Sequence, residues 1–272
     1  HRLVTVNMIP DASNDNLMVM RSYQIQATRG ILQRIKEMES SGLIEKEGGY
    51  IWHTTGSGKT VTSFKVAQLL ASAPRVRNVL FIVDRVDLID QTLENFKDFA
   101  YMHFKKRIKK VNGRELKREL KHKGASQILL ISVQGLTKAV KNGLTNDEWN
   151  VIIMDEAHRS ASGESVKLIK KAFKKTTWFG FTGTPNFYSD EINDVTTSRD
   201  ISTHDIFGKR VHTYTIKDAI GDGNVLGFDV TYFKPHWVVE NAESDFSEQE
   251  YEKEVYQRDR KSVVRERVSR VV

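Results

Sequence analysis

The stretch Tyr50-Ile51-Trp52-His53-Thr54-Thr55-Gly56-Ser57-Gly58-Lys59-Thr60 decides the fold. An apolar, strand-like run enters a loop of small residues, and a helical pattern leaves that loop from Lys59 to Leu70. Such a loop turns several backbone N–H groups toward one point, and the helix N-terminus behind it adds partial positive charge. The sequence therefore predicts a pocket for the phosphates of a nucleoside triphosphate.

The loop residues have distinct predicted roles. Gly56 and Gly58 let the backbone approach phosphate oxygens without a Cβ in the way. Lys59 would place a positive charge on the β- and γ-phosphates, and the Thr60 hydroxyl would ligate Mg²⁺. We assign as nucleotide-binding the loop residues Thr55, Gly56, Ser57, Gly58, Lys59 and Thr60. His53 replaces the first glycine of the phosphate-loop consensus, and the alternative is a glycine-rich turn before an ordinary helix.

Composition excludes several classes of protein. Of the 272 residues, 39% are apolar and 28% are charged, as in globular proteins. No apolar run approaches the ~20 residues of a membrane span and no signal peptide is present, so we expect no membrane partner. The absence of cysteine excludes disulfides and thiolate metal sites, and fits a reducing cytoplasm. Because the sequence starts at His1, we expect it to be part of a longer polypeptide.

The positive charge is concentrated in one segment. The net charge is +7, and Lys105 to Lys123 contains ten Lys or Arg residues against Glu115 and Glu119, a local balance of +8. All the other residues together therefore carry a charge of −1. A solvated loop and helix would explain such a run, and so would a contact to nucleic-acid phosphates. The sequence leaves both interpretations open.

Strand-like and helix-like segments alternate along the chain. Residues 1–20 have no clear period, and a helix is predicted from Arg21 to about Met38. Buried strands are predicted at 78–83, 127–132, 151–154 and 177–181, and helices at 86–99 and 163–175. This alternation predicts a parallel sheet with right-handed crossovers, whose ligands gather at the carboxyl ends of the strands. After Pro185 the pattern changes to a polar loop over 186–204, β-like runs at 211–215, 225–226 and 228–233, a turn at Asp222-Gly223 and a charged helix from about Ser247.

A second site motif, Asp155-Glu156-Ala157-His158, follows the apolar run Val151 to Met154. Two adjacent carboxylates at the end of a buried strand are costly unless positive charge arrives. Mg²⁺ held by Thr60 and, through water, by Asp155 would supply that charge, and Glu156 would then act on the attacking water. The alternative is a pair of acidic residues that caps the following helix.

Further polar residues stand at the same predicted edge. Thr182 and Thr184, in Thr-Gly-Thr-Pro, offer hydroxyls to His158 or Glu156 and would couple the nucleotide state to DNA contacts. A plain turn is the alternative. Ahead of the phosphate loop, the Gln24 amide can pair with the adenine edge, although it could also be an exposed glutamine at a helix start.

The order of these motifs resembles the first RecA-like domain of a superfamily-two helicase or translocase. The order is Tyr23-Gln24, Gly56 to Thr60, Val83-Asp84-Arg85, Ser132-Val133-Gln134, Asp155 to His158 and Thr182 to Pro185. More narrowly, the chain resembles the R subunit of type I restriction–modification enzymes. The narrower resemblance rests on Ile51 to Thr60, Val83 to Gln91, Asp155 to Ser160, Phe179 to Pro185 and Tyr214 to Ile220.

The resemblance implies an α/β fold of the RecA-like P-loop NTPase class, with a mostly parallel sheet flanked by helices over residues 21–235. Residues 1–20 would be a linker from a nuclease domain, and 236–272 would lead to a second RecA-like domain. In this family an arginine of the second domain completes the ATP site, so we expect the chain alone to hydrolyse ATP poorly. We assign no Asp…Glu-x-Lys nuclease constellation in this sequence, and we expect the nuclease to be absent from it.

The resemblance also implies the site residues and partners. Lys59, Asp155 and Glu156 would be catalytic, Tyr23 and Gln24 would join the nucleotide site, and ATP and Mg²⁺ would be the cofactors. DNA phosphates would be contacted by Arg85, Ser132 and Gln134. The partners would be double-stranded DNA and the methyltransferase (M) and specificity (S) subunits, in a bacterial or archaeal cytoplasm.

We therefore predict an ATP-dependent double-stranded DNA translocase motor of a type I restriction endonuclease. ATP hydrolysis would be coupled to movement along DNA and, in the full enzyme, to cleavage remote from the recognition site. The alternatives are a superfamily-two DNA or RNA helicase or remodeller without nuclease coupling, and a nucleotide-switched DNA-binding module. A small-molecule P-loop kinase is disfavoured by Asp155 to His158 and by the lack of an acceptor-substrate lid.

Overall fold

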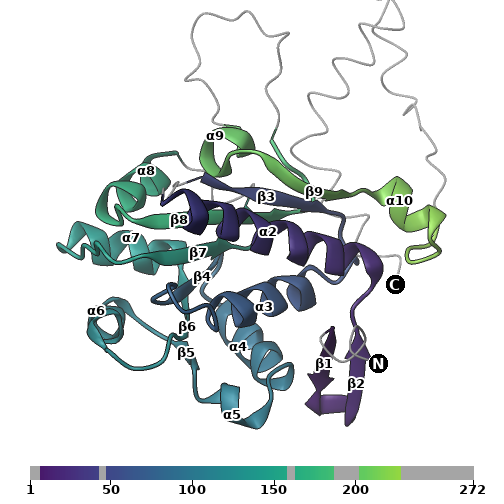
Figure 1. Ribbon diagram of the computed structural model, residues 1–272, viewed down its shortest axis with the longest axis horizontal. Coiled ribbons are helices and arrows are strands. Elements are labelled where there is room, and N and C mark those ends of the chain that lie inside the picture. The colour runs from purple at the N-terminus through teal and green to yellow at the C-terminus, as the bar shows by residue number, and fades with distance from the viewer. Residues whose placement is uncertain (1–6, 43–46, 158–162, 187–201, 228–272) are drawn as a thin grey trace, which may run out of the picture. The chain divides into compact units, whose positions relative to one another are not determined.

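A parallel β-sheet is the centre of the fold (Figure 1). The computed structural model describes residues 7–42, 47–157, 163–186 and 202–227. In this part of the chain seven strands pair in the order β5-β6-β4-β7-β8-β3-β9, and every pair is parallel. Their bounds are β3 Glu47–His53, β4 Val79–Val83, β5 Ile108–Lys110, β6 Ile128–Ser132, β7 Asn150–Met154, β8 Thr176–Thr182 and β9 Arg210–Tyr214. The predicted α/β class with a mostly parallel sheet is confirmed.

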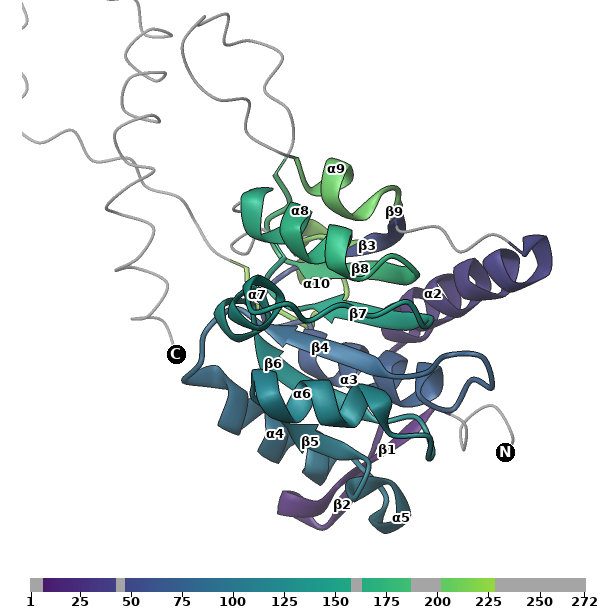
Figure 2. The ribbon, with the colours of Figure 1, turned by 90° about the vertical axis from the view of Figure 1, so that its left-hand side faces the viewer.

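Helices cover both faces of this sheet (Figure 2). Those packed on one face are α2 Ser22–Ser41, α3 Lys59–Leu70, α4 Leu88–Asp98 and the short α5 Met102–Lys105. Those on the other face are α6 Gly113–Lys121, α7 Val133–Lys141, α8 Gly163–Ala172 and α9 Thr203–Phe207, and α10 Ile216–Gly221 follows β9. None of these described helices is long and apolar enough to cross a membrane.

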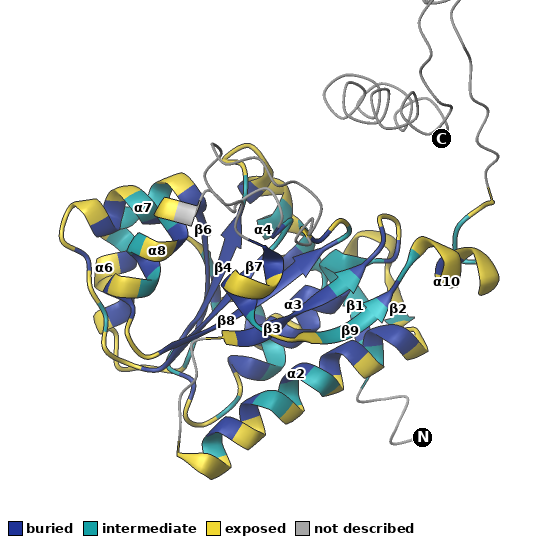
Figure 3. Ribbon diagram, turned by 90° about the horizontal axis from the view of Figure 1, so that it is seen from above, coloured by how far each residue is buried: buried dark blue, intermediate teal, exposed yellow. Residues whose placement is uncertain are grey.

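The central strands are buried on both faces, as their continuous apolar runs predict (Figure 3). Alternate residues of β4 illustrate the packing. Val79 and Phe81 join the core beneath α2, α3 and α4, whereas Leu80 and Ile82 join the core beneath α6, α7 and α8. The helices on both sides therefore fix the sheet, and the loops at its carboxyl edge start from a rigid base.

Residues near the amino end form a hairpin that the sequence pattern did not indicate. β1 Met8–Asp11 and β2 Asn16–Val19 pair in antiparallel fashion around the turn η1 Ala12–Asn14. Ile9 is buried in the main core, and the buried Lys65 of α3 donates a hydrogen bond of 3.3 Å to the Met8 carbonyl oxygen. Four-residue strands are too short to show a period, so tertiary contacts rather than patterning order this segment.

Two other local predictions differ from the structure. The short edge strand β5 lies inside the basic segment, where the sequence Ile-Lys-Lys has no apolar run to reveal it. Residues 225–226, predicted to be β-like, form no strand, because the Val225 N–H donates to the Ala219 carbonyl at the end of α10. The predicted turn at Asp222-Gly223 is confirmed, while the predictions at 228–233 and beyond Ser247 fall outside the described residues.

Candidate active site

The strand order brings the predicted motifs to one edge of the sheet. β8 lies between β3 and β7, so the loops that follow these strands are neighbours. The phosphate-loop sequence follows β3, and Asp155-Glu156 follows β7. Thr182 is the last residue of β8, and the rest of the Thr182 to Pro185 motif comes directly after that strand. Motifs that are about a hundred residues apart in the sequence therefore meet at the carboxyl ends of adjacent parallel strands.

Lys59 is the point where these loops converge. Its Nζ atom lies 3.9 Å from Oε1 of Glu156 and 3.5 Å from the Thr54 carbonyl oxygen. A Cβ placed on Gly183 would lie 3.5 Å from the same Nζ atom and 3.3 Å from the His53 carbonyl oxygen. Gly183 is thus a position of close approach, where a methyl group would be tight against the His53 carbonyl and in contact with the Lys59 amine.

The phosphate loop has the backbone that its glycines allow. Gly56 and Gly58 both adopt left-handed conformations, with φ of 75° and 72°. Ser57 closes the turn, because its hydroxyl donates a 2.6 Å hydrogen bond to the Thr54 carbonyl. α3 begins at Lys59, and no side chain caps its N-terminus at Gly58. The first amide groups of this 12-residue helix are thus without a side-chain cap at the loop, as a phosphate site requires.

The carboxylate pair is held in an unfavourable electrostatic state. Burial and the neighbouring Glu156 charge raise the pKa of Asp155 to about 6, and Lys59 only partly opposes this shift. Glu156 has a left-handed backbone with φ of 47°, which is uncommon for a residue with a side chain, and its N–H donates to Asp155 Oδ1 over 3.0 Å. A cation beside Asp155 would relieve the repulsion between the two carboxylates.

The residues present fit a nucleoside triphosphate with Mg²⁺. Asp155 offers a buried carboxylate, Thr60 a partly exposed hydroxyl and Lys59 a positive charge beside a glycine turn with an uncapped helix behind it. Mg²⁺ prefers oxygen ligands and keeps several waters when it is held by one or two protein groups together with substrate phosphates. Among the described residues no cluster of three or more His, Cys, Asp or Glu side chains could hold a metal ion.

Tyr23 and Gln24 lie directly against the phosphate loop. The Tyr23 hydroxyl donates to the Ser57 carbonyl over 2.7 Å, and Gln24 Nε2 is 3.2 Å from the carbonyl oxygens of both Ser57 and Gly58. The Gln24 Oε1 atom accepts from the Arg21 N–H and closes a capping box at the start of α2. Both ends of this amide are therefore engaged, and adenine recognition by Gln24 stays a prediction.

His53 fills the position of the missing glycine with a buried ring. It is 0% exposed, and its Nε2 atom shares a 3.0 Å hydrogen bond with Nδ1 of His212 in β9. Burial, helped by His212 and Lys59, lowers the pKa of His53 to about 3, so the ring is neutral at physiological pH. Tyr214 stacks on Tyr23, with ring centroids 3.6 Å apart.

Sequence reasoning missed three residues of this surrounding structure. They are Trp52, His212 and Tyr214. The β-like run at 211–215 was the signal that could have found two of them, because a further parallel strand ends at the same edge of the sheet. Trp52 lies inside the deciding stretch itself, and its indole Nε1–H donates a 3.0 Å hydrogen bond to the Gly183 carbonyl.

The predicted coupling residues are only partly described. Thr182 ends β8, is fully buried, and its Oγ1 accepts from the Thr184 N–H over 3.1 Å. That contact fixes the turn that follows β8 and packs against the phosphate loop. His158 lies outside the described residues, so its contact with these threonines stays a prediction.

The predicted DNA-contacting residues lie at the carboxyl ends of β4, which is next to β7, and of β6, which follows β4 in the sheet. Val83 of β4 is in register with Ser132 of β6, and Gln134 Nε2 donates over 3.3 Å to the Asp84 carbonyl, beside Arg85. Ser132 is buried and its hydroxyl caps α7 by accepting from the Gly135 N–H, so its local role is structural. The Arg85 side chain is 52% exposed and faces Asp84 at 3.8 Å.

Comparison with known proteins identifies the class that this fold and site define. A family profile described as SWI2/SNF2 ATPase matches residues 23–263, which include every motif above. The chain therefore belongs to the SWI2/SNF2 ATPase family.

Sequence relatives narrow this class to the endonuclease subunits of type I restriction enzymes. The SsaAORF53P endonuclease subunit of Staphylococcus saprophyticus is 39% identical over 237 residues, which are 85% of this chain and 24% of that protein. The C-terminal part of the putative MpnIIP endonuclease of Mycoplasma pneumoniae is 37% identical over 59% of this chain and 82% of its own length. The chain spans about a quarter of the length of the staphylococcal relatives, and the resemblance to R subunits is confirmed.

Solved structures agree on the fold. A nuclease-deletion mutant of the Type ISP restriction–modification enzyme LlaGI has a TM-score of 0.54 and 19% identity, and covers 76% of this chain and 21% of that one. The UvsW helicase of bacteriophage T4 has a TM-score of 0.51 and 18% identity over 77% of this chain and 64% of its own. The RecA-like helicase fold is thereby confirmed.

Proposed function

We propose that this chain is the ATP-hydrolysing part of a motor that moves double-stranded DNA within a type I restriction endonuclease. The observation that carries the proposal is the 3.9 Å approach of Lys59 Nζ to Glu156 Oε1 at the ends of nearby parallel strands. Had these groups lain on opposite faces of the sheet, they could not act on one nucleotide.

The residues have separate roles in this proposal. Lys59 would hold the β- and γ-phosphates, and Thr60 and Asp155 would hold Mg²⁺, with Asp155 acting through water. When bound, the Mg²⁺–ATP complex would supply the transferable phosphoryl group and neutralise charge that develops on it. Glu156 would orient the attacking water and accept its proton. Its left-handed backbone is consistent with a side chain held in position for that task.

Thr182 and Thr184, with His158, would couple hydrolysis to DNA contacts. The turn that contains Gly183 touches the phosphate loop on one side, and Trp52 of β3 holds its carbonyl. A change at the phosphates could thus reach β8 through a rigid contact. Arg85 and Gln134, at the ends of β4 and β6, would contact DNA phosphates.

The complete enzyme would add what this chain does not contain. We propose that residues 1–20 connect to a nuclease domain, that 21–235 form the first RecA-like domain, and that 236–272 lead to a second RecA-like domain. That domain would supply an arginine to the ATP site. Association with M and S subunits would supply DNA specificity, and cleavage would occur away from the recognition site. Relatives that are endonuclease subunits support this assignment, as do neighbours described in complex with DNA.

Glu156→Gln in the full-length protein tests the proposal. General-base removal is expected to lower DNA-stimulated ATP hydrolysis at least about 100-fold, while ATP binding is retained. Movement along DNA, measured as displacement of a third strand from a duplex, should stop with it. The exposed Glu164 of α8 provides the control, and Glu164→Gln should change neither rate. Unchanged hydrolysis in Glu156→Gln would instead favour a nucleotide-switched binding module.

A further inference from the structure

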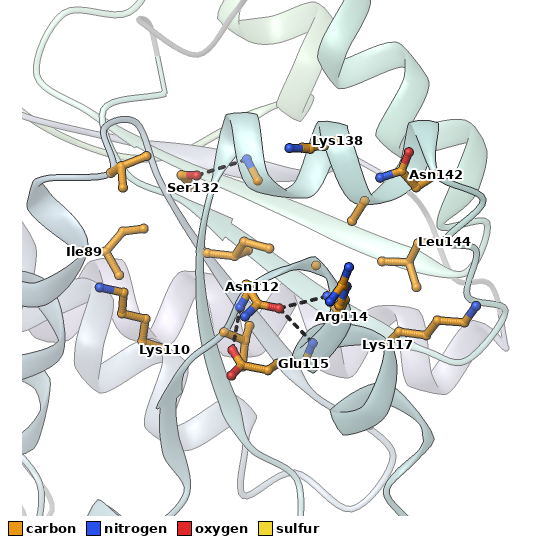
Figure 4. Close-up of a pocket in the computed structure, with 16 residues that line it drawn as sticks. Ile89, Lys110, Asn112, Arg114, Glu115, Lys117, Ser132, Lys138, Asn142 and Leu144 are labelled. Carbon is orange, nitrogen blue, oxygen red and sulfur yellow. Dashed lines mark hydrogen bonds between the residues drawn. The ribbon is translucent and has the colours of Figure 1, made fainter.

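A groove between α6 and α7 lies beside the proposed DNA contacts (Figure 4). It has a volume of about 770 Å³ and opens at the carboxyl ends of β5 and β6. Cationic side chains from three elements line it, namely Lys110 at the end of β5, Arg114 and Lys117 on α6, and Lys138 on α7. Neither the phosphate site nor its neighbouring motifs use these residues.

Ion pairing divides the cations of the basic segment and of α7 into two groups. The first group stabilises the fold: Lys109 pairs with the buried Glu119 at 2.9 Å, and Lys110 pairs with Asp90 at 2.7 Å. Arg107 donates to the backbone carbonyls of Ser126 and Ala71. These contacts are internal to the domain, so their charges are already compensated or buried.

The second group has no such partner. Arg114, Lys117 and Lys138 are partly or fully exposed, and none of them pairs with an acidic side chain among the described residues. The one carboxylate that lines the groove, Glu115, instead accepts from the Asn112 N–H in the capping box of α6. These three cations outnumber the single carboxylate, and the groove therefore presents a net positive charge to solvent.

Most apolar residues of the groove are buried, and one further lining residue, Val86, is 58% exposed. Ile89, Val111, Ile131 and Leu144 line it, yet they are only 4%, 6%, 1% and 5% exposed. An amphipathic protein segment needs a broad apolar surface to bury, and one exposed valine above a buried floor does not supply it. Charge is what the groove offers, and a polyanion is the ligand that such a surface fits.

The groove is continuous with the residues proposed to contact DNA. Ser132 lines it, and Gln134, on the first turn of α7, donates to the Asp84 carbonyl next to Arg85. The cations of α6 and α7 thus extend the row of strand-end residues outward from β4 and β6 toward the edge strand β5. A strand of DNA that meets Arg85 and Gln134 would reach the groove next.

We propose that Arg114, Lys117 and Lys138 form a phosphate-contacting track for duplex DNA, separate from the ATP site. This inference rests on the proposed function, because it assumes that the motor acts on DNA. The track reads no sequence, since phosphate contacts position a protein on DNA without specifying bases. Its contribution to DNA affinity is electrostatic and therefore decreases as the salt concentration rises.

The test is the salt dependence of duplex binding by the full-length protein with R114Q, K117Q and K138Q together. The probe is a blunt duplex without a recognition site. Each lost phosphate contact reduces the magnitude of the negative slope of log K against log salt by roughly 0.9, so the triple variant should reduce it by about 3. The matched control is K171Q, K174Q and K175Q, which removes the same charge from exposed positions at the end of α8 and just before β8, near the amino end of that strand, and should leave the slope unchanged.

Further measurements separate this inference from the proposed function. DNA-independent ATP hydrolysis should be the same in both triple variants, because neither set touches the phosphate loop. A slope equal to that of the control overturns the track; if Arg85→Gln still weakens binding, the motor assignment stands without it. Absence of duplex binding by the unaltered protein overturns both proposals.

Two more outcomes sharpen the test. Loss of binding to a polyglutamate peptide with DNA binding unchanged would assign the groove to an acidic protein segment and overturn the track. The single K117E variant, which reverses a charge, should reduce the magnitude of the slope by at least about 1 and provides a second variant at an exposed site.

Discussion

The phosphate-loop side of the sheet and the α6–α7 groove use polar residues in opposite ways. Around the loop, polar groups bond to one another: Tyr23 and Gln24 donate to the Ser57 carbonyl, and His53 Nε2 bonds to His212. In the groove, the cations of the proposed track face solvent without acidic partners among the described residues. The first arrangement is preorganised for one ligand in one geometry, whereas the second suits many equivalent contacts of modest strength. The proposed motor needs both, because ATP must be held in one geometry while the DNA must move past its contacts.

The largest expected effect is on ATP affinity, and it is tested by replacing one lysine in each of the two regions. Lys59→Ala removes a charge whose side chain is only 11% exposed, and ATP affinity should fall about 100-fold, as expected for a lost charge-assisted contact of about 3 kcal/mol. Lys138→Ala in the groove should leave ATP affinity within about twofold. Calorimetric titration with ATP and Mg²⁺ measures both. Equal losses would mean that the two regions are not functionally distinct.

The fold could be predicted from sequence because its strands are buried on both faces. Val79–Val83 and Val151–Met154 are continuous apolar runs, and strand–helix alternation permits few topologies. The edges could not be predicted in the same way. Ile108–Lys110 is short and charged, and the hairpin that contains Ile9 is ordered by packing and by Lys65 rather than by a local pattern.

In the candidate site, too, the central residues could be predicted from the sequence and the surrounding ones could not. Lys59, Asp155 and Glu156 follow predicted strands, so the parallel sheet alone brings them to one edge. The residues that hold this site in place gave only a weaker signal, the β-like run at 211–215. His212 and Tyr214 act through side-chain contacts across β3 and β9, and the register of two strands cannot be read from either strand alone.

A smaller effect, on the pH dependence of stability, tests whether the buried His53 ring is shielded from water. The pKa of His53 is about 3 in the folded protein. Below pH 6.5 this imidazole therefore binds a proton in the unfolded chain but stays neutral in the folded chain. Stability from this residue is therefore complete above pH 6.5 and is lost as pH falls toward 3. Between pH 7.5 and 5 the stability of the wild type should fall by about 2 kcal/mol relative to His53→Asn, which does not titrate.

Urea unfolding of both proteins at each pH gives this difference. Asp155, whose raised pKa acts in the opposite direction between about pH 4 and 6, is present in both proteins and cancels in the comparison. A constant difference across this range would show that water reaches the His53 ring and that the loop side resembles the groove.

The smallest effect concerns the contact between the phosphate loop and β8. Trp52→Phe keeps an aromatic ring but removes the N–H that donates to Gly183, at an expected cost of about 1 kcal/mol in stability. DNA-stimulated ATP hydrolysis should fall severalfold with the KM for ATP unchanged, because Lys59 and its loop remain intact. Trp149 provides the matched control, since its indole N–H donates to Thr177 Oγ1 near the amino ends of β7 and β8, away from the site. Trp149→Phe should lower stability similarly and leave hydrolysis unchanged; if both variants lower hydrolysis equally, the effect is one of general stability and the Trp52–Gly183 contact has no role in coupling.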